Sequence, residues 1–145
     1  MGKYDVLKLE NQICFPLYAA AKEIVRKYKP ILDELDLTYT QYIAMMVLWE
    51  KEKVSVKELG EKLYLDSGTL TPVVKSLEQK GYVSRARLSS DERVLQVALT
   101  DKGRELKDKA LSVPERIVSS CVALSPTEAA TLYTLLYKIL GVSKE

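Results

Sequence analysis

Hydrophobic residues recur at helical spacing through the first 50 positions and predict two helices. The apolar positions of the first helix follow one another at three or four residues from Leu17 to Tyr28. Pro16 is tolerated there if it falls in the first turn, and Pro30 marks the predicted end. The pattern Thr38-Tyr39-Thr40-Gln41 is that of a capping box and predicts the start of the second helix. Because that helix is apolar nearly all round, we expect it to be the buried centre of the protein.

The next segment predicts two helices joined by a tight turn. The capping pattern Ser55-Val56-Lys57-Glu58 predicts the start of a short helix. A turn at Tyr64-Leu65 separates it from a longer helix, which is predicted over residues 67–80. Gly81 follows as a left-handed cap, since glycine adopts that conformation without a steric penalty.

The remaining pattern predicts a β-hairpin and two more helices. Residues 82–87 and 94–99 alternate between apolar and polar positions, as two paired strands do. Thr100-Asp101 caps a long helix with a predicted bend at Pro114, and Ser125-Pro126-Thr127-Glu128 caps the last helix. The predicted fold class is therefore mainly α with a small β-hairpin wing (α+β), a winged helix-turn-helix.

The predicted organisation is a single domain over residues 1–145. Residues of about 55–99 form the winged helix, and the helices of about 1–35 and 101–145 are expected to mediate dimerisation. These terminal helices carry more apolar side chains than one small winged helix can cover. A two-fold homodimer would bury them, and it would place two reading helices on DNA half-sites one turn apart.

Composition narrows the classes of protein that fit. The chain has 145 residues and a formal net charge of +2, so DNA binding has to rest on a local basic patch. No apolar run approaches a membrane span and the N-terminus has no apolar signal core, so we expect a cytoplasmic protein without a membrane partner. The absence of histidine argues against a zinc site of the usual kind and removes the commonest general base. No metal or other cofactor is expected.

The helix predicted over residues 67–80 has a polar face suited to DNA. Small hydroxyls and methyl groups fit base edges and thymine methyls, a lysine fits guanine or phosphate, and backbone amides at a helix start bind phosphate. The candidate DNA-binding residues in and before this helix are Asp66, Ser67, Thr69, Thr71, Pro72 and Lys75. Any amphipathic helix has a polar face, but the preceding short helix, the turn and the following hairpin favour the DNA interpretation.

The hairpin supplies the positive charge expected of a DNA-binding wing. Arg85, Arg87 and Arg93 are its basic residues, and Asp91 lies within reach of Arg93. Asp91 would orient that guanidinium into a minor groove. The alternative interpretation is a solvated hairpin whose charges contact only water.

The two cysteines, Cys14 and Cys121, are far apart in the sequence and form no CxxC pair. Cys14 lies near the start of the first helix, where the helix dipole stabilises the thiolate that attacks peroxides. Tyr18 follows one turn later, whereas Tyr28 is too far along the same helix to reach Cys14 except across an antiparallel dimer. The plain alternative is that both cysteines are small core residues and the tyrosines pack a dimer interface.

Several segments resemble the MarR family of winged-helix repressors, and within it the organic-hydroperoxide sensors. The resemblance spans residues 9 to about 106 and includes Asn11-Gln12-Ile13-Cys14-Phe15, Tyr28-Lys29-Pro30, Leu37-Thr38-Tyr39-Thr40-Gln41-Tyr42 and residues 64–72. It implies that Cys14 is the reactive cysteine and that Tyr28 and Tyr39, with Tyr18 close by, donate hydrogen bonds to its thiolate. It also implies two fates for oxidised Cys14: a disulfide to Cys121 of the other protomer, or one to a low-molecular-weight thiol.

The resemblance and the residues together predict a homodimeric repressor that binds a pseudo-palindromic operator in double-stranded DNA. An organic hydroperoxide would convert Cys14 to a sulfenic acid and then a disulfide, and the operator would be released. One alternative keeps DNA binding but replaces the chemistry with a lipophilic or phenolic ligand in the dimer cleft. Another is a thiol peroxidase, although the sequence offers no base beside either cysteine.

Overall fold

The computed structural model describes residues 1–121 and 123–142, without the side chains of residues 120 and 121. Two short 3₁₀ turns, η1 (Asp5–Leu7) and η2 (Leu9–Asn11), precede helix α1 (Cys14–Asp33). Pro16 lies in the first turn of α1, as predicted. Pro30, however, does not end the helix, which continues to Asp33 because the side chains of Ile31 and Leu32 are buried in the core and hold the last turn in place.

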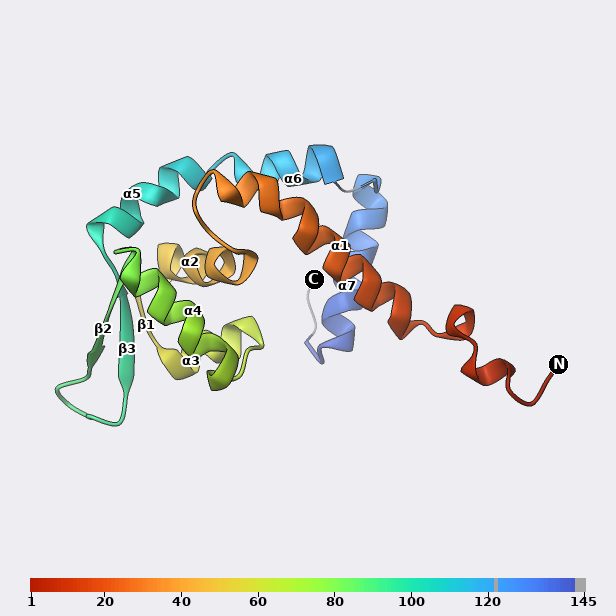
Figure 1. Cartoon of the computed structure of the whole chain (residues 1–145), viewed down its shortest axis with the longest axis horizontal. Coiled ribbons are helices and arrows are strands. Elements are labelled where there is room, and N and C mark those ends of the chain that lie inside the picture. The colour runs from red at the N-terminus through yellow and green to blue at the C-terminus, as the bar shows by residue number, and fades with distance from the viewer. Residues whose placement is uncertain (122, 143–145) are drawn as a thin grey trace.

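Helix α2 (Tyr39–Lys51) runs through the centre of the core (Figure 1). Its start is the predicted capping box: the Gln41 backbone N–H donates to Thr38 Oγ1, and the Thr38 N–H donates to Gln41 Oε1. Ala44, Met45 and Leu48 have no exposed surface. The prediction of a buried central helix is confirmed.

The winged helix follows α2. It comprises β1 (Lys53–Ser55), α3 (Val56–Leu63), α4 (Ser67–Gln79), β2 (Val83–Arg87) and β3 (Leu95–Leu99). The sheet has the antiparallel order β1-β3-β2, so the predicted hairpin is joined by a third strand that the sequence analysis missed. Strand β1 has only three residues, too few for an alternating pattern, and its Val54 pairs with the distant Val97.

The ends of the two helices that form the helix-turn-helix are fixed locally. Ser55 Oγ accepts the Glu58 N–H at 3.0 Å at the start of α3, and Tyr64 adopts a left-handed conformation in the turn. At the end of α4, Gly81 has φ +84°. The N–H groups of Gly81 and Tyr82 return to carbonyl oxygens of the last turn of α4, which is a Schellman cap.

The C-terminal region contains three helices: α5 (Asp101–Ala110), α6 (Val113–Cys121) and α7 (Pro126–Ile139). The prediction of one long helix bent at Pro114 is therefore wrong, because the helix is interrupted at residues 111–112. Pro114 has no N–H to donate to the carbonyl of Ala110, so a continuous helix would lose that bond and clash one turn back. In the structure Pro114 is instead the second residue of α6, where a proline is tolerated.

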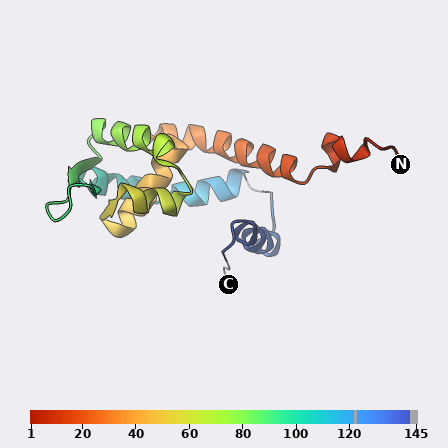
Figure 2. The same cartoon turned by 90° about the horizontal axis from the view of Figure 1, so that it is seen from below.

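Both ends of the chain project from the core. The first half of α1, the 3₁₀ turns and α7 lie apart from the winged helix (Figures 1 and 2). Helix α7 has no buried residue. Large apolar side chains are exposed at both ends, among them Val6, Leu7, Leu9, Ile13, Phe15, Leu17, Leu132, Tyr133, Leu135, Ile139 and Leu140. Exposed apolar side chains that gather in this way are typical of an interaction surface.

Candidate nucleic-acid interface and cysteine site

The outer face of α4 carries all the residues predicted from its sequence to read DNA. Leu70, Val74 and Leu77 are buried on its inner face. The exposed residues on the outer face are Ser67, Thr69, Thr71, Pro72 and Lys75. This face therefore presents hydroxyls, methyl groups and one ammonium to a partner.

Two hydrogen bonds shape the start of this face. Asp66 caps the helix by accepting the Thr69 N–H at 2.8 Å, and this bond lowers the pKa of the Asp66 carboxyl. Thr71 Oγ1 donates its proton to the carbonyl of Ser67 at 2.7 Å. Because that proton is occupied, the Thr71 hydroxyl offers an outside group its lone pairs, next to its methyl group.

The wing loop holds one arginine ready for contact. Arg93 Nε and Nη2 donate to the two carboxylate oxygens of Asp91 at 3.1 and 3.2 Å, as the sequence analysis expected of this pair. The pKa of Asp91 is lowered by these bonds. The Arg93 side chain is nevertheless 90% exposed, so three of its five donors remain free for DNA. Arg87, at the end of β2, is exposed as well.

Arg85 was predicted to contact DNA, but the structure places it in an ion pair. Its Nη2 and Nε donate to Glu78 Oε1 on α4, at 3.0 and 3.2 Å, and lower the pKa of that carboxyl. The pair joins β2 to α4. A direct contact from Arg85 to DNA remains a prediction.

Three tyrosines meet where α1 crosses the start of α2. The ring of Tyr28 lies 4.9 Å from that of Tyr39 and 5.8 Å from that of Tyr42, between ring centres. Burial raises the pKa of Tyr39 and of Tyr42, so their hydroxyls stay protonated and able to donate. Tyr42 was not predicted from the sequence to belong to the site, although its position three residues after Tyr39 on one helix face is a signal for it.

Cys14 is exposed and is the first residue of α1. It precedes Tyr28 by 14 residues, or about 21 Å along a helix. The cysteine and the tyrosine cluster therefore do not meet within one chain. Tyr18, one turn after Cys14, is exposed, and Lys22 Nζ lies 5.2 Å from its ring centre. The side chain of Cys121 lies outside the described residues.

Two further features concern metals and membranes in the part of the chain that the structure describes. No group of three or more histidine, cysteine, aspartate or glutamate side chains there is placed to hold a metal ion. No helix within the same residues is long and apolar enough to cross a membrane.

Comparison with known proteins gives this arrangement a context. The family model for the transcriptional regulator SarA/Rot matches residues 26–110, more than half of the chain. The organic hydroperoxide resistance transcriptional regulator of Bacillus subtilis strain 168 is 49% identical over 139 residues, which cover 93% of this chain and 94% of that protein.

Solved structures agree with the sequence comparison. Reduced AbfR bound to DNA is 33% identical, covers 96% of both chains and has a TM-score of 0.78. Disulfide-formed AbfR is 35% identical over 95% of this chain and 96% of that one, with a TM-score of 0.64. An Escherichia coli MarR mutant in complex with operator DNA shares the fold, with a TM-score of 0.78 at 23% identity over 97% and 99% of the two chains.

These relatives are regulators of transcription, not enzymes, and the exposed face of α4 and the wing are the surfaces through which a winged helix binds DNA. The protein is a DNA-binding transcriptional regulator with the predicted winged-helix fold. The chain belongs to the SarA/Rot family of transcriptional regulators, and it shares its winged-helix fold with MarR.

Proposed function

We propose that the protein is a homodimeric repressor that releases its operator when an organic hydroperoxide oxidises Cys14. The observation that carries the proposal is the position of Cys14, which is exposed at the outer end of α1 among uncovered apolar side chains. The Bacillus subtilis relative bears the name of an organic hydroperoxide resistance regulator. Because a repressor acts on the chromosome, we place the protein in the cytoplasm.

A second copy of the chain is the partner that fits the uncovered ends. The apolar residues of the N-terminal segment and of α7 need a matching apolar surface, and a two-fold dimer supplies one from the same residues. The dimer would present two α4 helices to a pseudo-palindromic operator. It would also bring Cys14 of one protomer to Tyr28 and Tyr39 of the other, which the length of α1 prevents within one chain.

The chemistry follows from this arrangement. Phenol hydroxyls that stay protonated donate hydrogen bonds to the Cys14 thiolate without placing a full charge beside it. The thiolate attacks the outer oxygen of the hydroperoxide, so that an S–O bond forms as the O–O bond breaks. The alcohol leaves after taking up a proton, and Cys14 becomes a sulfenic acid. A second thiol, from Cys121 or a low-molecular-weight compound, then displaces water to form a disulfide.

Operator binding before and after oxidation tests the proposal. DNA selected with the reduced protein from a random pool is titrated with protein treated with one equivalent of cumene hydroperoxide. Wild type should lose binding and recover it with dithiothreitol, whereas Cys14→Ser should bind before and after treatment. If the Cys14→Ser complex also dissociates, Cys14 is not the sensor and the proposal fails.

A non-covalent ligand is the second candidate for the signal. A cleft of about 230 Å³ beside the tyrosine cluster is lined by the apolar residues Val25, Leu32 and Leu37, by Tyr39, and by the polar residues Arg26, Lys29, Asp33 and Thr38. A phenolic or lipophilic compound could occupy it without any oxidation. Release of DNA from the Cys14→Ser variant by such a compound, in the absence of peroxide, would favour this function over cysteine chemistry.

A further inference from the structure

We infer that Gln41 is a positioning residue that transmits the state of the tyrosine cluster to the reading helix α4. The inference rests on the proposed function, because it assigns the route by which oxidation would reach the DNA-binding face. Gln41 is 7% exposed and is the one buried polar side chain among the residues that the structure describes. A buried amide is costly unless its polar atoms are bonded, so its partners are informative.

On one side Gln41 belongs to the turn of α2 that carries the tyrosines. It is the third residue of the helix, between Tyr39 and Tyr42. Its Oε1 accepts the Thr38 N–H at 3.0 Å and so fixes the start of the helix. A shift of Tyr39 therefore moves the Gln41 backbone with it, because both residues lie in one hydrogen-bonded turn.

On the other side the same amide is bonded to α4. Gln41 Nε2 donates to Ser76 Oγ at 2.9 Å, and Oε1 accepts from Lys80 Nζ at 3.0 Å. Lys80 Nζ also donates to the carbonyl of Asp36, in the corner between α1 and α2. The second half of α4 is thus bonded both to the corner and to the first turn of α2.

These bonds connect the two functional surfaces in a short path. Ser76 is the residue next to Lys75, the basic residue of the DNA-reading face. A 13-residue helix moves as a rod, so a displacement of its second half changes the direction of its first half, where Ser67, Thr69 and Thr71 lie. Apolar contacts between α2 and α4 hold the helices together, and the directional bonds of Gln41 add a preference for one relative placement.

Removal of the Ser76 hydroxyl separates this role from helix capping. Ser76→Ala deletes the bond to Gln41 Nε2 but leaves the Thr38–Gln41 cap intact. The matched control is Ser55→Ala, which also deletes one serine hydrogen bond within the DNA-binding unit, at the start of α3. The measured quantity is the ratio of operator dissociation constants of oxidised and reduced protein, together with the rate of Cys14 oxidation by cumene hydroperoxide.

We expect Ser76→Ala to lower this ratio about 2- to 10-fold, the range that one intramolecular hydrogen bond supports. The rate of Cys14 oxidation should not change. Ser55→Ala should weaken both forms equally and leave the ratio at the wild-type value. If Ser76→Ala also weakens both forms equally, Gln41 only supports the fold and the inference is overturned.

A measurement without peroxide distinguishes this failure from a failure of the proposed function. In a double-mutant cycle on operator affinity of the reduced protein, Tyr39→Phe and Ser76→Ala should combine non-additively, by at least about 2-fold. Additive effects would overturn the link even if oxidation releases DNA. Wild type that keeps its operator after oxidation would instead overturn the proposed function, and with it the role of Gln41 in redox signalling.

Discussion

Replacement of Arg93 by alanine should weaken operator binding most strongly at low salt. The Arg93 guanidinium is 90% exposed and already aligned by Asp91, so little side-chain entropy is lost when it contacts DNA. Each lost phosphate contact reduces the slope of log affinity against log salt by about 0.9, and the proposed dimer has two wings, so the slope should fall by about 1.8. The ratio of the operator dissociation constants of variant and wild type should therefore fall about tenfold between about 50 and 200 mM salt.

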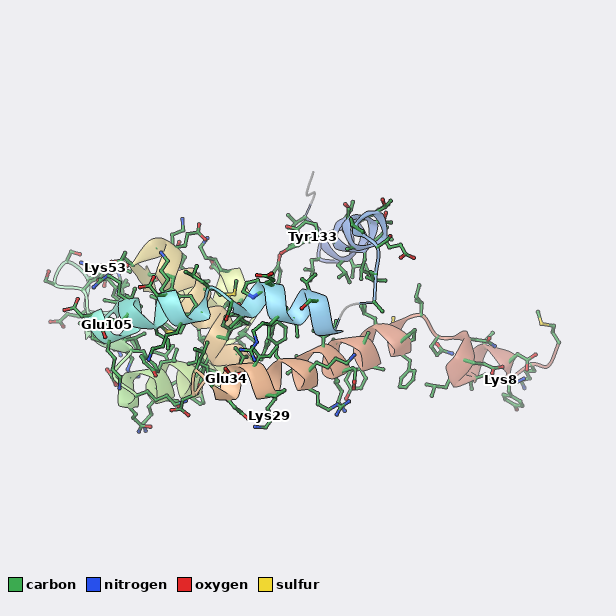
Figure 3. The ribbon with its side chains drawn as sticks, turned by 90° about the horizontal axis from the view of Figure 1, so that it is seen from above. Lys8, Lys29, Glu34, Lys53, Glu105 and Tyr133 are labelled. Atoms are coloured by element: carbon green, nitrogen blue, oxygen red, sulfur yellow. The ribbon has the colours of Figure 1, made fainter. Side chains whose placement is uncertain are left out.

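Fluorescence anisotropy with labelled operator at four or more salt concentrations measures this slope. Arg93→Lys keeps the charge but loses the paired bonds to Asp91, so it should keep the slope and bind more weakly. Lys29→Ala removes a positive charge from α1, away from the wing, and serves as the control (Figure 3). Unchanged affinity of Arg93→Ala at every salt concentration would refute contact between the wing and DNA.

Two further predictions concern contacts of residues in the winged helix. Gly103→Ala should destabilise the protein by about 2 kcal/mol or more in denaturant unfolding, because its Cβ would lie 2.2 Å from the Tyr82 carbonyl oxygen. Gly68→Ala, whose Cβ meets only Asp66 Oδ1 at 3.4 Å, should be tolerated. If both variants lose the same free energy of unfolding, the clash at Gly103 is not the cause. Arg85→Ala should raise the pKa of Glu78 toward its ordinary value in an NMR titration. The ion pair stabilises the fold at pH values above the ordinary pKa of Glu78, and this stabilisation is lost as the pH falls through the lowered pKa. A Glu78 pKa that does not change in Arg85→Ala would contradict the pairing.

Features encoded within a few residues were predictable from the sequence. The capping boxes at Thr38 and Ser125 and the glycine cap at Gly81 all formed, because each depends on bonds within one turn. The separation of Cys14 from Tyr28 also followed from the sequence, since helix rise fixes it.

Features that depend on distant partners were not predictable. Strand β1 exists because Val54 pairs with Val97, and a run of three residues gives no pattern of its own. Arg85 appeared to be a free cation in the sequence, whereas its partner Glu78 faces it only once the wing folds back on α4. Gln41 had an evident local role as a cap, but its bond to Ser76 spans 35 residues.

The position of α6 bears on the fate of oxidised Cys14. Helix α6 lies alongside α1 and runs in the opposite direction (Figures 1 and 3). Arg116 Nη2 pairs with Glu34 Oε2 at 2.6 Å, which aligns the two helices. Cys121 ends α6 five residues after Arg116, or about 7.5 Å further along. From Glu34, this direction runs back along α1 toward the start of that helix.

Cys14 lies 20 residues before Glu34, or about 30 Å along α1, so α6 covers only part of the way to it. A disulfide requires Cα atoms within about 7 Å, so the two cysteines of one protomer cannot bond while α1 is intact. A Cys14 thiolate that reaches Tyr28 of the other protomer would instead approach the region where α6 of that protomer packs on α1. Oxidised wild type should therefore run as a covalent dimer on a non-reducing gel, and Cys121→Ser as a monomer with a sulfenic acid that dimedone traps. A monomer with an internal disulfide in oxidised wild type would contradict the helix geometry, and a monomer without a disulfide would leave the small-thiol route as the mechanism.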